Sequence, residues 1–187
     1  MIAKQFAIGF AFAALLLIAG VLSARAAVVE STANGFAVEE KSPIAASPAN
    51  VYAALIHPEK WWNSEHTFSG SATNLSLDAK AGGCLCEILP GGGSVAHLTV
   101  VMVMPDKAIV FRGAMGPFQG QGVDGALAFT LAAKDGGTDL VLDNNVGGFI
   151  KGGMGTWPQA ADGMLADLVA HLKYFAENAK SMPAPAK

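Results

Sequence analysis

The sequence predicts an α+β fold in which an antiparallel sheet packs against one long helix at the end of the chain. Short apolar runs between residues 67 and 148 are separated by turn sequences such as the Pro-Gly-Gly-Gly stretch at 90–93. Tight turns of this kind join neighbouring antiparallel strands. No segment between the runs is long enough for a crossover helix, which excludes a parallel sheet. Residues 156–178 carry apolar side chains at steps of three and four, the pattern of an amphipathic helix.

The segment before these runs predicts one strand followed by two short helices. Residues 35–45 have strand character, whereas residues 27–33 are expected to form a short leader. Ser47 and Pro48 predict a helix start, because serine is a favoured N-cap and proline fits the first helical position. That helix is expected to end near His57, and Pro58 can begin a second short helix that runs to Trp62.

The remaining elements follow from the same patterns. Strands are expected at 67–77, 84–89, 94–104, 108–113, 125–133 and 138–148. The apolar stripe of the final helix consists of Ala161, Leu165, Leu168, Leu172 and Phe175. One domain is predicted over residues 34–178, and residues 179–187, with their Ser-Met-Pro-Ala-Pro sequence, are expected to be a disordered tail.

The beginning of the chain resembles a secretory signal peptide. The chain is 52% hydrophobic and only 14% charged, and the run from Phe6 to Leu22 has no charged residue. Ala24-Arg25-Ala26 places small residues at the two positions that signal peptidase reads. We expect cleavage after Ala26 and a secreted or periplasmic protein. The alternative is a membrane anchor that stays uncleaved, since the run approaches the length of a bilayer span.

Charge narrows the range of partners. Removal of residues 1–26, which contain Lys4 and Arg25 and no acidic residue, changes the formal net charge from −3 to −5. No cluster of Lys and Arg follows, so neither nucleic acid nor an anionic membrane surface is an expected partner. No stable membrane insertion is expected after cleavage, and the oligomeric state stays open.

The two cysteines, Cys84 and Cys86, lie two residues apart in a predicted strand. In a regular strand such positions are about 6.5 Å apart and their side chains are nearly parallel, which disfavours a disulfide. Two cysteines alone also make a poor zinc site. We therefore expect both thiols to be reduced and buried.

The order of elements and three sequence stretches carry a resemblance to a known superfamily. The stretches are ASPANVYAALIHPEKWW, GGCLCEILPGGGSVAHLTVV and LADLVAHLKYFAEN. Over roughly residues 35–178 the chain resembles the SRPBCC or START-like superfamily, in the branch of chaperone-ATPase activators and polyketide cyclases. The resemblance implies a helix-grip fold, with a curved sheet of about seven strands around the long helix and an apolar cavity between them. Export does not fit the cytosolic chaperone role, so that role is not expected.

Three polar residues on successive strands are candidates for a site. Glu87 lies in an otherwise apolar strand, where a buried carboxylate is costly without partners. The turn at 90–93 brings it beside His97 or to a diagonal position, and Arg112 on the next strand could reach the same region. The three residues could line a pocket or form a salt-bridged structural set, and Glu87 could instead face solvent.

Aromatic and helical residues complete the expected ligand-binding set. Trp61 and Trp62 are adjacent, so they cannot both point the same way, and at least one is expected to face a groove. The other members are Phe111, Leu168 and His171. Of Asn144 and Asn145, one is expected to point inward.

No sequence motif defines a reaction. The glycine-rich stretches lack the spacing of phosphate-binding loops, and no nucleophile elbow, zinc-protease motif or acidic ligand cluster occurs. No metal and no cofactor are expected. The sequence predicts a carrier that binds a small, largely apolar molecule. The alternatives are a cyclase-type or hydrolase-type enzyme with Glu87 and His97 as acid and base, and a scaffold without a ligand.

Overall fold

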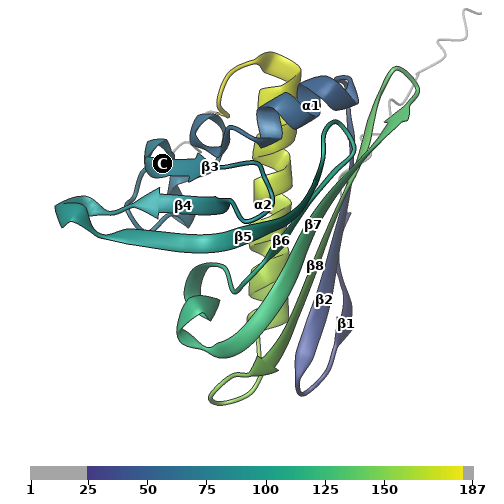
Figure 1. Ribbon diagram of the computed structural model, residues 1–187. Coiled ribbons are helices and arrows are strands. Elements are labelled where there is room, and N and C mark those ends of the chain that lie inside the picture. Colours follow the sequence, from purple (N-terminus) through teal and green to yellow (C-terminus); the bar gives the residue numbers. More distant parts are fainter. Residues whose placement is uncertain (1–24, 183–187) are drawn as a thin grey trace, which may run out of the picture.

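The computed structural model describes residues 25–182, which form one curved antiparallel sheet closed by a long helix (Figure 1). The eight strands lie in the order β1-β2-β8-β7-β6-β5-β4-β3. Their bounds are β1 Arg25–Ser31, β2 Gly35–Ile44, β3 Leu75–Leu77, β4 Cys84–Ile88, β5 Ser94–Met104, β6 Ala108–Arg112, β7 Gly122–Lys134 and β8 Gly137–Phe149. The helices are α1, Pro48–Leu55, and α2, Trp157–Asn178. The predicted α+β class and helix-grip arrangement are therefore confirmed.

Strand β1 corrects one expectation. Residues 27–33, expected to be a leader, contribute most of this edge strand, which pairs with β2 in antiparallel register. The pairing is possible because β2 uses only one of its edges for β8. The predicted signal segment lies almost entirely outside the described residues, but the expected cleavage site after Ala26 falls inside β1. Cleavage there would leave the strand starting at Ala27.

Helix α1 and the turns after it follow the sequence signals closely. The Ser47 side chain accepts a hydrogen bond from the amide of Asn50 at 3.3 Å, and Pro48 is the first helical residue. A short 3₁₀ helix, η1, spans Pro58–Lys60, where the second helix was expected. It ends against Trp61, whose indole is buried and donates from Nε1 to the carbonyl of Ala54 at 2.8 Å. The indole thus ties η1 to the end of α1.

Helix α2 supplies the largest share of the core. Leu165 and Leu172 are fully buried, and the helix contacts β1, β2 and α1. Each such leucine stabilises the fold by about 2–3 kcal/mol. Near its end, the Glu177 carboxylate accepts from the amide of Ala45 at 2.7 Å, and Lys173 Nζ donates to the carbonyl of Pro43 at 2.6 Å. These contacts fix the end of the helix to the end of β2.

The prediction of two free, buried thiols is wrong, because Cys84 and Cys86 form a disulfide. Strand β4 is not regular here: its register with β5 shifts between Leu85 and Cys86. The two Cα atoms are 5.3 Å apart, inside the range that a disulfide spans. Both cysteines are also partly exposed rather than buried, whereas Leu85 between them faces the core. The sequence argument failed because it assumed an undistorted strand.

Helices long and apolar enough to span a bilayer do not occur among residues 25–182. Residues 183–187 of the expected disordered tail lie outside the described part. The tail residue Ser181 is within it, and its hydroxyl donates to the carbonyl of Lys60 at 2.5 Å.

Candidate functional site

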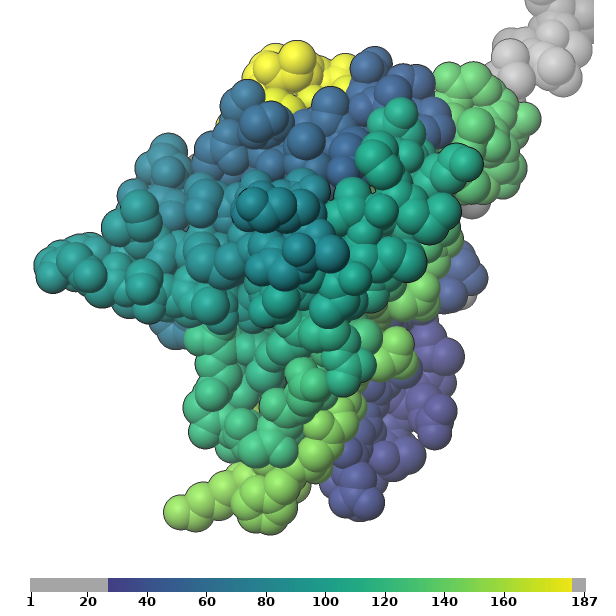
Figure 2. Space-filling model, in the orientation of Figure 1, coloured from purple at the N-terminus to yellow at the C-terminus, as the bar shows by residue number. Residues whose placement is uncertain are grey.

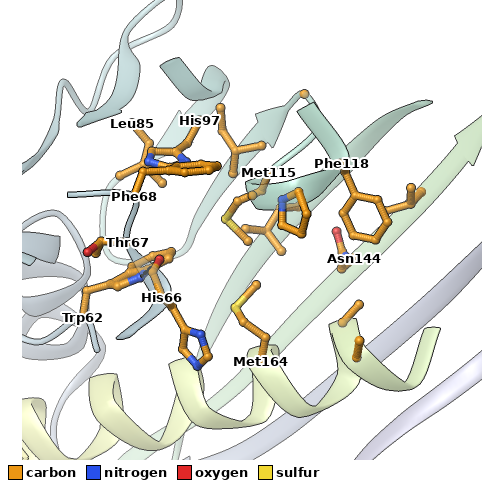
Figure 3. Close-up of a pocket in the computed structure, with 18 of the residues that line it drawn as sticks. Trp62, His66, Thr67, Phe68, Leu85, His97, Met115, Phe118, Asn144 and Met164 are labelled. Carbon is orange, nitrogen blue, oxygen red and sulfur yellow. Dashed lines mark hydrogen bonds between the residues drawn. The ribbon is translucent and has the colours of Figure 1, made fainter. Parts of the chain in front are cut away.

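A cavity of about 380 Å³ lies between α2, the sheet and the segment that follows η1 (Figure 3). Most of its wall is apolar. The wall comprises Trp62, Glu65, His66, Thr67, Phe68, Leu75, Leu85, His97, Leu98, Gly113, Met115, Gly116, Pro117, Phe118, Leu127, Asn144, Val146, Trp157, Ala160, Ala161 and Met164. The volume falls in the range typical of small-molecule sites.

His97 reaches this cavity because β5 contains a β-bulge. Leu85 pairs with Leu98 and Cys86 pairs with Ala96, so His97 is an extra residue with no partner on β4. The extra residue interrupts the alternation of faces, and the adjacent side chains of His97 and Leu98 are both buried. A regular strand would have turned one of the two to the outer face.

Glu87 is fully buried beside this histidine. Its Oε2 lies 2.8 Å from His97 Nε2 and accepts a hydrogen bond from the amide of Phe68 at 3.1 Å. The amide of Ser69 donates to Oε1. Glu87 therefore fixes both the histidine ring and the 68–69 segment. The predicted proximity of Glu87 and His97 is confirmed as a diagonal pair, since Glu87 lies directly opposite Val95.

The hydrogen bonds to Glu87 decide its charge. Burial alone would raise the pKa of the Glu87 carboxyl, but Ser69, through its hydroxyl and amide, together with His97 and the Phe68 amide, lowers that pKa below its ordinary value. The carboxylate is thus the form that the site holds at neutral pH. This carboxylate accepts a hydrogen bond from the N–H at Nε2 of His97. A neutral imidazole carries only one N–H, so its other ring nitrogen, Nδ1, is then a hydrogen-bond acceptor.

His97 Nδ1 has no hydrogen-bond partner among the described residues, although it is buried. The ring also stacks on Phe68, with centroids 5.8 Å apart and an angle of 20° between the planes. Phe68 lines the cavity and is 55% exposed, so this stack lies at the boundary between cavity and solvent. A buried polar atom without a partner is unusual, and here it belongs to a side chain of the cavity wall.

The other end of the cavity is aromatic. Phe118, from a 3₁₀ turn at Gly116–Gly120, packs on Trp157 with ring centroids 4.9 Å apart and on Phe36 at 5.9 Å. Met115 and Met164 stand between this end and His97 (Figure 3). Methionine side chains adapt their shape to what they contact, so this part of the wall can accommodate ligands of different outline.

The two adjacent tryptophans have different environments, although their rings contact each other with centroids 5.5 Å apart. Trp62 lines the cavity, and its Nε1 donates to the carbonyl of His66 at 3.3 Å. Trp61 is 2% exposed and belongs to the core. Of the two asparagines, Asn144 faces the cavity and Asn145 lies on the opposite face of β8.

Five other residues of the expected binding set are not part of the cavity wall, and one of them, Glu87, contacts the wall only through His97 and the 68–69 segment. Phe111 and Leu168 are buried in the core, and His171 bonds through Nδ1 to the carbonyl of Asp167 at 2.9 Å. Arg112 does not join Glu87 and His97. It follows the inward-facing Phe111 in regular alternation, so it points to solvent, where it pairs with Asp124 at 2.8 Å.

Several cavity residues were not identified from the sequence. Phe118, Met115 and Pro117 lie in a glycine-rich stretch between two predicted strands, and Phe68 lies in a predicted strand that is irregular in the structure. Trp157 and Met164 border the apolar stripe of α2, and Trp157 directly follows a glycine-rich loop. The sequence did contain one signal for these cavity residues, namely a large apolar side chain inside a glycine-rich connection. An exposed turn does not require such a side chain, so its presence indicates a buried position or a binding site.

The rim of the cavity is tied to α2 through Asp167. Its Oδ2 accepts from Asn63 Nδ2 at 3.0 Å and lies 3.2 Å from His66 Nε2. This carboxylate therefore holds the segment that carries Trp62 and His66 against the helix. No group of three or more metal-ligating side chains occurs within residues 25–182.

Comparisons with known proteins support the fold and leave the ligand open. No family model matches the sequence, and no curated protein matches it. Solved structures do match, among them an uncharacterised protein from Rhizobium leguminosarum, 19% identical, with a TM-score of 0.59 over 78% of this chain and 97% of that one.

Two further similar structures have informative names. Aha1 from Colwellia psychrerythraea, solved as a dimer, is 18% identical, with a TM-score of 0.52 over 77% of this chain and 98% of that one. CalU16 from Micromonospora echinospora is 15% identical, with a TM-score of 0.56 over 87% and 88%. The chain thus shares the fold of these solved structures, which is the helix-grip fold that the sequence resemblance implied.

Proposed function

We propose that the protein is an exported carrier that binds a small, largely apolar molecule with one polar group in the cavity. One observation carries the proposal: an apolar cavity of about 380 Å³ is lined by the buried His97, whose Nδ1 has no hydrogen-bond partner within residues 25–182. An apolar ligand would bind favourably because it would bury its surface against the aromatic and methionine side chains of the wall. A hydroxyl on that ligand would donate to Nδ1 and satisfy the buried nitrogen.

Export is supported by the sequence and by the disulfide. The uncharged segment and the Ala24-Arg25-Ala26 site have the features of a signal peptide. A disulfide between Cys84 and Cys86 suits an oxidising compartment outside the cytoplasm. The intact mass of the exported protein tests this part, since cleavage after Ala26 predicts a chain that begins at Ala27. A membrane-bound protein that retains Met1 would contradict it.

Native mass spectrometry of protein purified from its own cell envelope tests the carrier proposal. We expect a bound small molecule that is lost when the cavity is blocked. Ala160→Trp is a suitable blocking variant, because Ala160 lines the cavity and is exposed, so the core is not disturbed. Ala170→Trp is the matched control on the exposed face of the same helix. Equal retention of the molecule by both variants would refute the proposal.

The pair of Glu87 and His97 also favours a second candidate, an enzyme that uses His97 as a general base. The carboxylate fixes the imidazole through Nε2 and leaves Nδ1 free to accept a proton from a bound substrate. Glu87→Gln distinguishes the two candidates. A carrier changes its affinity or selectivity only, whereas an enzyme loses turnover of the bound molecule while much of its binding is retained.

A further inference from the structure

The disulfide lies on the outer face of the wall that positions the site. Along β4, Leu85 and Glu87 face inward, whereas Cys84 and Cys86 alternate with them and are partly exposed. The residues paired with the two cysteines, Thr99, Ser76 and Ala96, are all exposed. A small thiol in solution can therefore approach the sulfur atoms without opening the core.

The same disulfide lies directly opposite the bulge that aims His97. Cys86 pairs with Ala96 and Leu85 pairs with Leu98, the two neighbours of the extra histidine. The disulfide holds the Cα atoms of Cys84 and Cys86 at 5.3 Å, shorter than the roughly 6.5 Å of a regular strand. Strand β4 is therefore contracted where β5 contains one extra residue. A β-bulge accommodates this difference in length between two paired strands.

The disulfide adds little to global stability, because it encloses a single residue. Stabilisation by a disulfide comes largely from the length of chain it closes, and here that loop is minimal. Its consequence is local instead. The enclosed residue, Leu85, lines the cavity, and the next inward residue, Glu87, holds His97 and the 68–69 segment.

We propose that Cys84 and Cys86 form a thiol–disulfide exchange site that controls ligand binding in the cavity, a proposal that rests on the carrier function above. The oxidised form fixes β4 and aims His97 and Glu87. Reduction lets β4 extend, moves its register against the bulge and loosens the hydrogen bonds from Phe68 and Ser69. The reductant is a small dithiol, which reaches the sulfur atoms from the outer face.

The exchange proceeds in two balanced steps. A thiolate of the dithiol attacks the sulfur of one cysteine, forming a mixed disulfide, while the bond between Cys84 and Cys86 breaks and the leaving sulfur takes up a proton. The second thiolate of the reagent then attacks the mixed disulfide and releases the other cysteine as a thiol. The protein gains two electrons and two protons, and the dithiol becomes a cyclic disulfide.

Anilinonaphthalene sulfonate, an apolar fluorescent probe, and dithiothreitol test the proposal on the exported chain. Thiol counting on unfolded, unreduced protein should find none, and a count of two would overturn the proposal. After reduction of the folded protein we expect probe affinity to fall by at least about fivefold, the lower end of typical coupling between sites. Saturating probe should make the disulfide harder to reduce by the same factor, because linkage is reciprocal.

The Cys84→Ser/Cys86→Ser double variant is the control for the reductant. It should bind the probe as the reduced protein does, with or without dithiothreitol. Hydrogen exchange at the amides of Phe68 and Ser69 gives a second readout that needs no ligand, and exchange should be faster after reduction. Equal probe affinity in both redox states overturns the proposed control, whatever the exchange rates. If the probe binds neither state, the carrier function fails, and amide exchange alone decides whether the disulfide fixes the wall.

Discussion

His97, in the wall of the cavity, has its Nε2 2.8 Å from Glu87 Oε2, and both side chains are almost completely removed from solvent. The pair joins three segments that are separate in sequence: β4, the bulge of β5 and the loop at 68–69. A buried ion or dipole pair of this kind stabilises the fold only while all its partners are present. The pair therefore couples the shape of the cavity to the stability of the fold.

Removing the charge of Glu87 should be costly. We expect Glu87→Gln to lower the free energy of unfolding by about 2 kcal/mol, because several charge-assisted hydrogen bonds are weakened. In a double-mutant cycle with His97→Ala, a coupling energy of about 0.5–3 kcal/mol is expected for residues in contact. Urea unfolding of the four proteins measures it.

The exposed pair Arg112 and Asp124 is the matched comparison for that cycle. Both side chains are more than half exposed, so the cycle of Arg112→Gln and Asp124→Asn should give a coupling energy below about 1 kcal/mol. If the coupling energy between Glu87 and His97 is no larger than this value, the two buried residues do not stabilise the fold through their mutual interaction.

The two tryptophans should respond differently to substitution. Trp62→Ala is expected to weaken binding of an apolar fluorescent probe with a small change in stability, because Trp62 lines the cavity and is only partly buried. Trp61→Phe should lower stability by about 1–3 kcal/mol, since it removes the buried hydrogen bond from Nε1 to the Ala54 carbonyl, which keeps only the amide of His57 as a donor, and shrinks a core side chain. Fluorescence titration and thermal unfolding measure both effects. If Trp61→Phe weakens binding as strongly as Trp62→Ala, the assignment of the wall is wrong.

Glu40 gives the protein a predictable dependence on pH. Its side chain in β2 is fully buried, and neither carboxyl oxygen has a hydrogen-bond partner in the described part of the chain. Burial, and after it the nearby charge of Asp162, raises the pKa of Glu40 from 4.5 to about 7. The folded state therefore holds a proton that the unfolded state releases near pH 4.5. Stability is full below that pH and falls as the pH rises towards 7, by roughly 2–3 kcal/mol between about pH 5 and pH 8.5.

Glu40→Gln tests this assignment. The variant should be more stable than the natural protein at about pH 8.5, and the loss of stability with rising pH should largely disappear. Glu39→Gln is the control, because the neighbouring Glu39 is partly exposed and pairs with Lys41. Urea unfolding at several pH values measures both variants. A pH profile of Glu40→Gln that is parallel to that of the natural protein would contradict the prediction.

The rim should depend on Asp167. Asp167→Ala removes the acceptor shared by Asn63 and His66, so we expect weaker probe binding and a loss of about 1 kcal/mol in stability. Asp139→Ala, which breaks an exposed pair with Lys134 on the β7–β8 hairpin, should change neither by a comparable amount. The hairpin projects from the body of the molecule, as does the turn between β4 and β5 on another side (Figures 1 and 2). Unchanged binding in Asp167→Ala would mean that the rim is held by other contacts.

The sequence by itself determined the start of α1, the order of the elements from β4 onward and the core-facing stripe of α2. The serine and proline at 47 and 48 placed the start of α1, and the stripe of Leu165, Leu168 and Leu172 placed α2 against the sheet. These features are local: caps, turns and periodicity act over a few residues, so they can be read from neighbours in the chain. The proximity of Glu87 and His97 also followed from a local feature, the short turn between their strands.

Only the tertiary structure decided what makes the cavity a site. The bulge at His97, the contraction of β4 between the cysteines and the outward direction of Arg112 all depend on strand register. Register is set by pairing with strands elsewhere in the sheet, and a shift of one residue exchanges the inner and outer faces. The same reason explains Phe118 and Trp157, which meet because a glycine-rich turn and the start of a helix fold onto each other from distant parts of the chain.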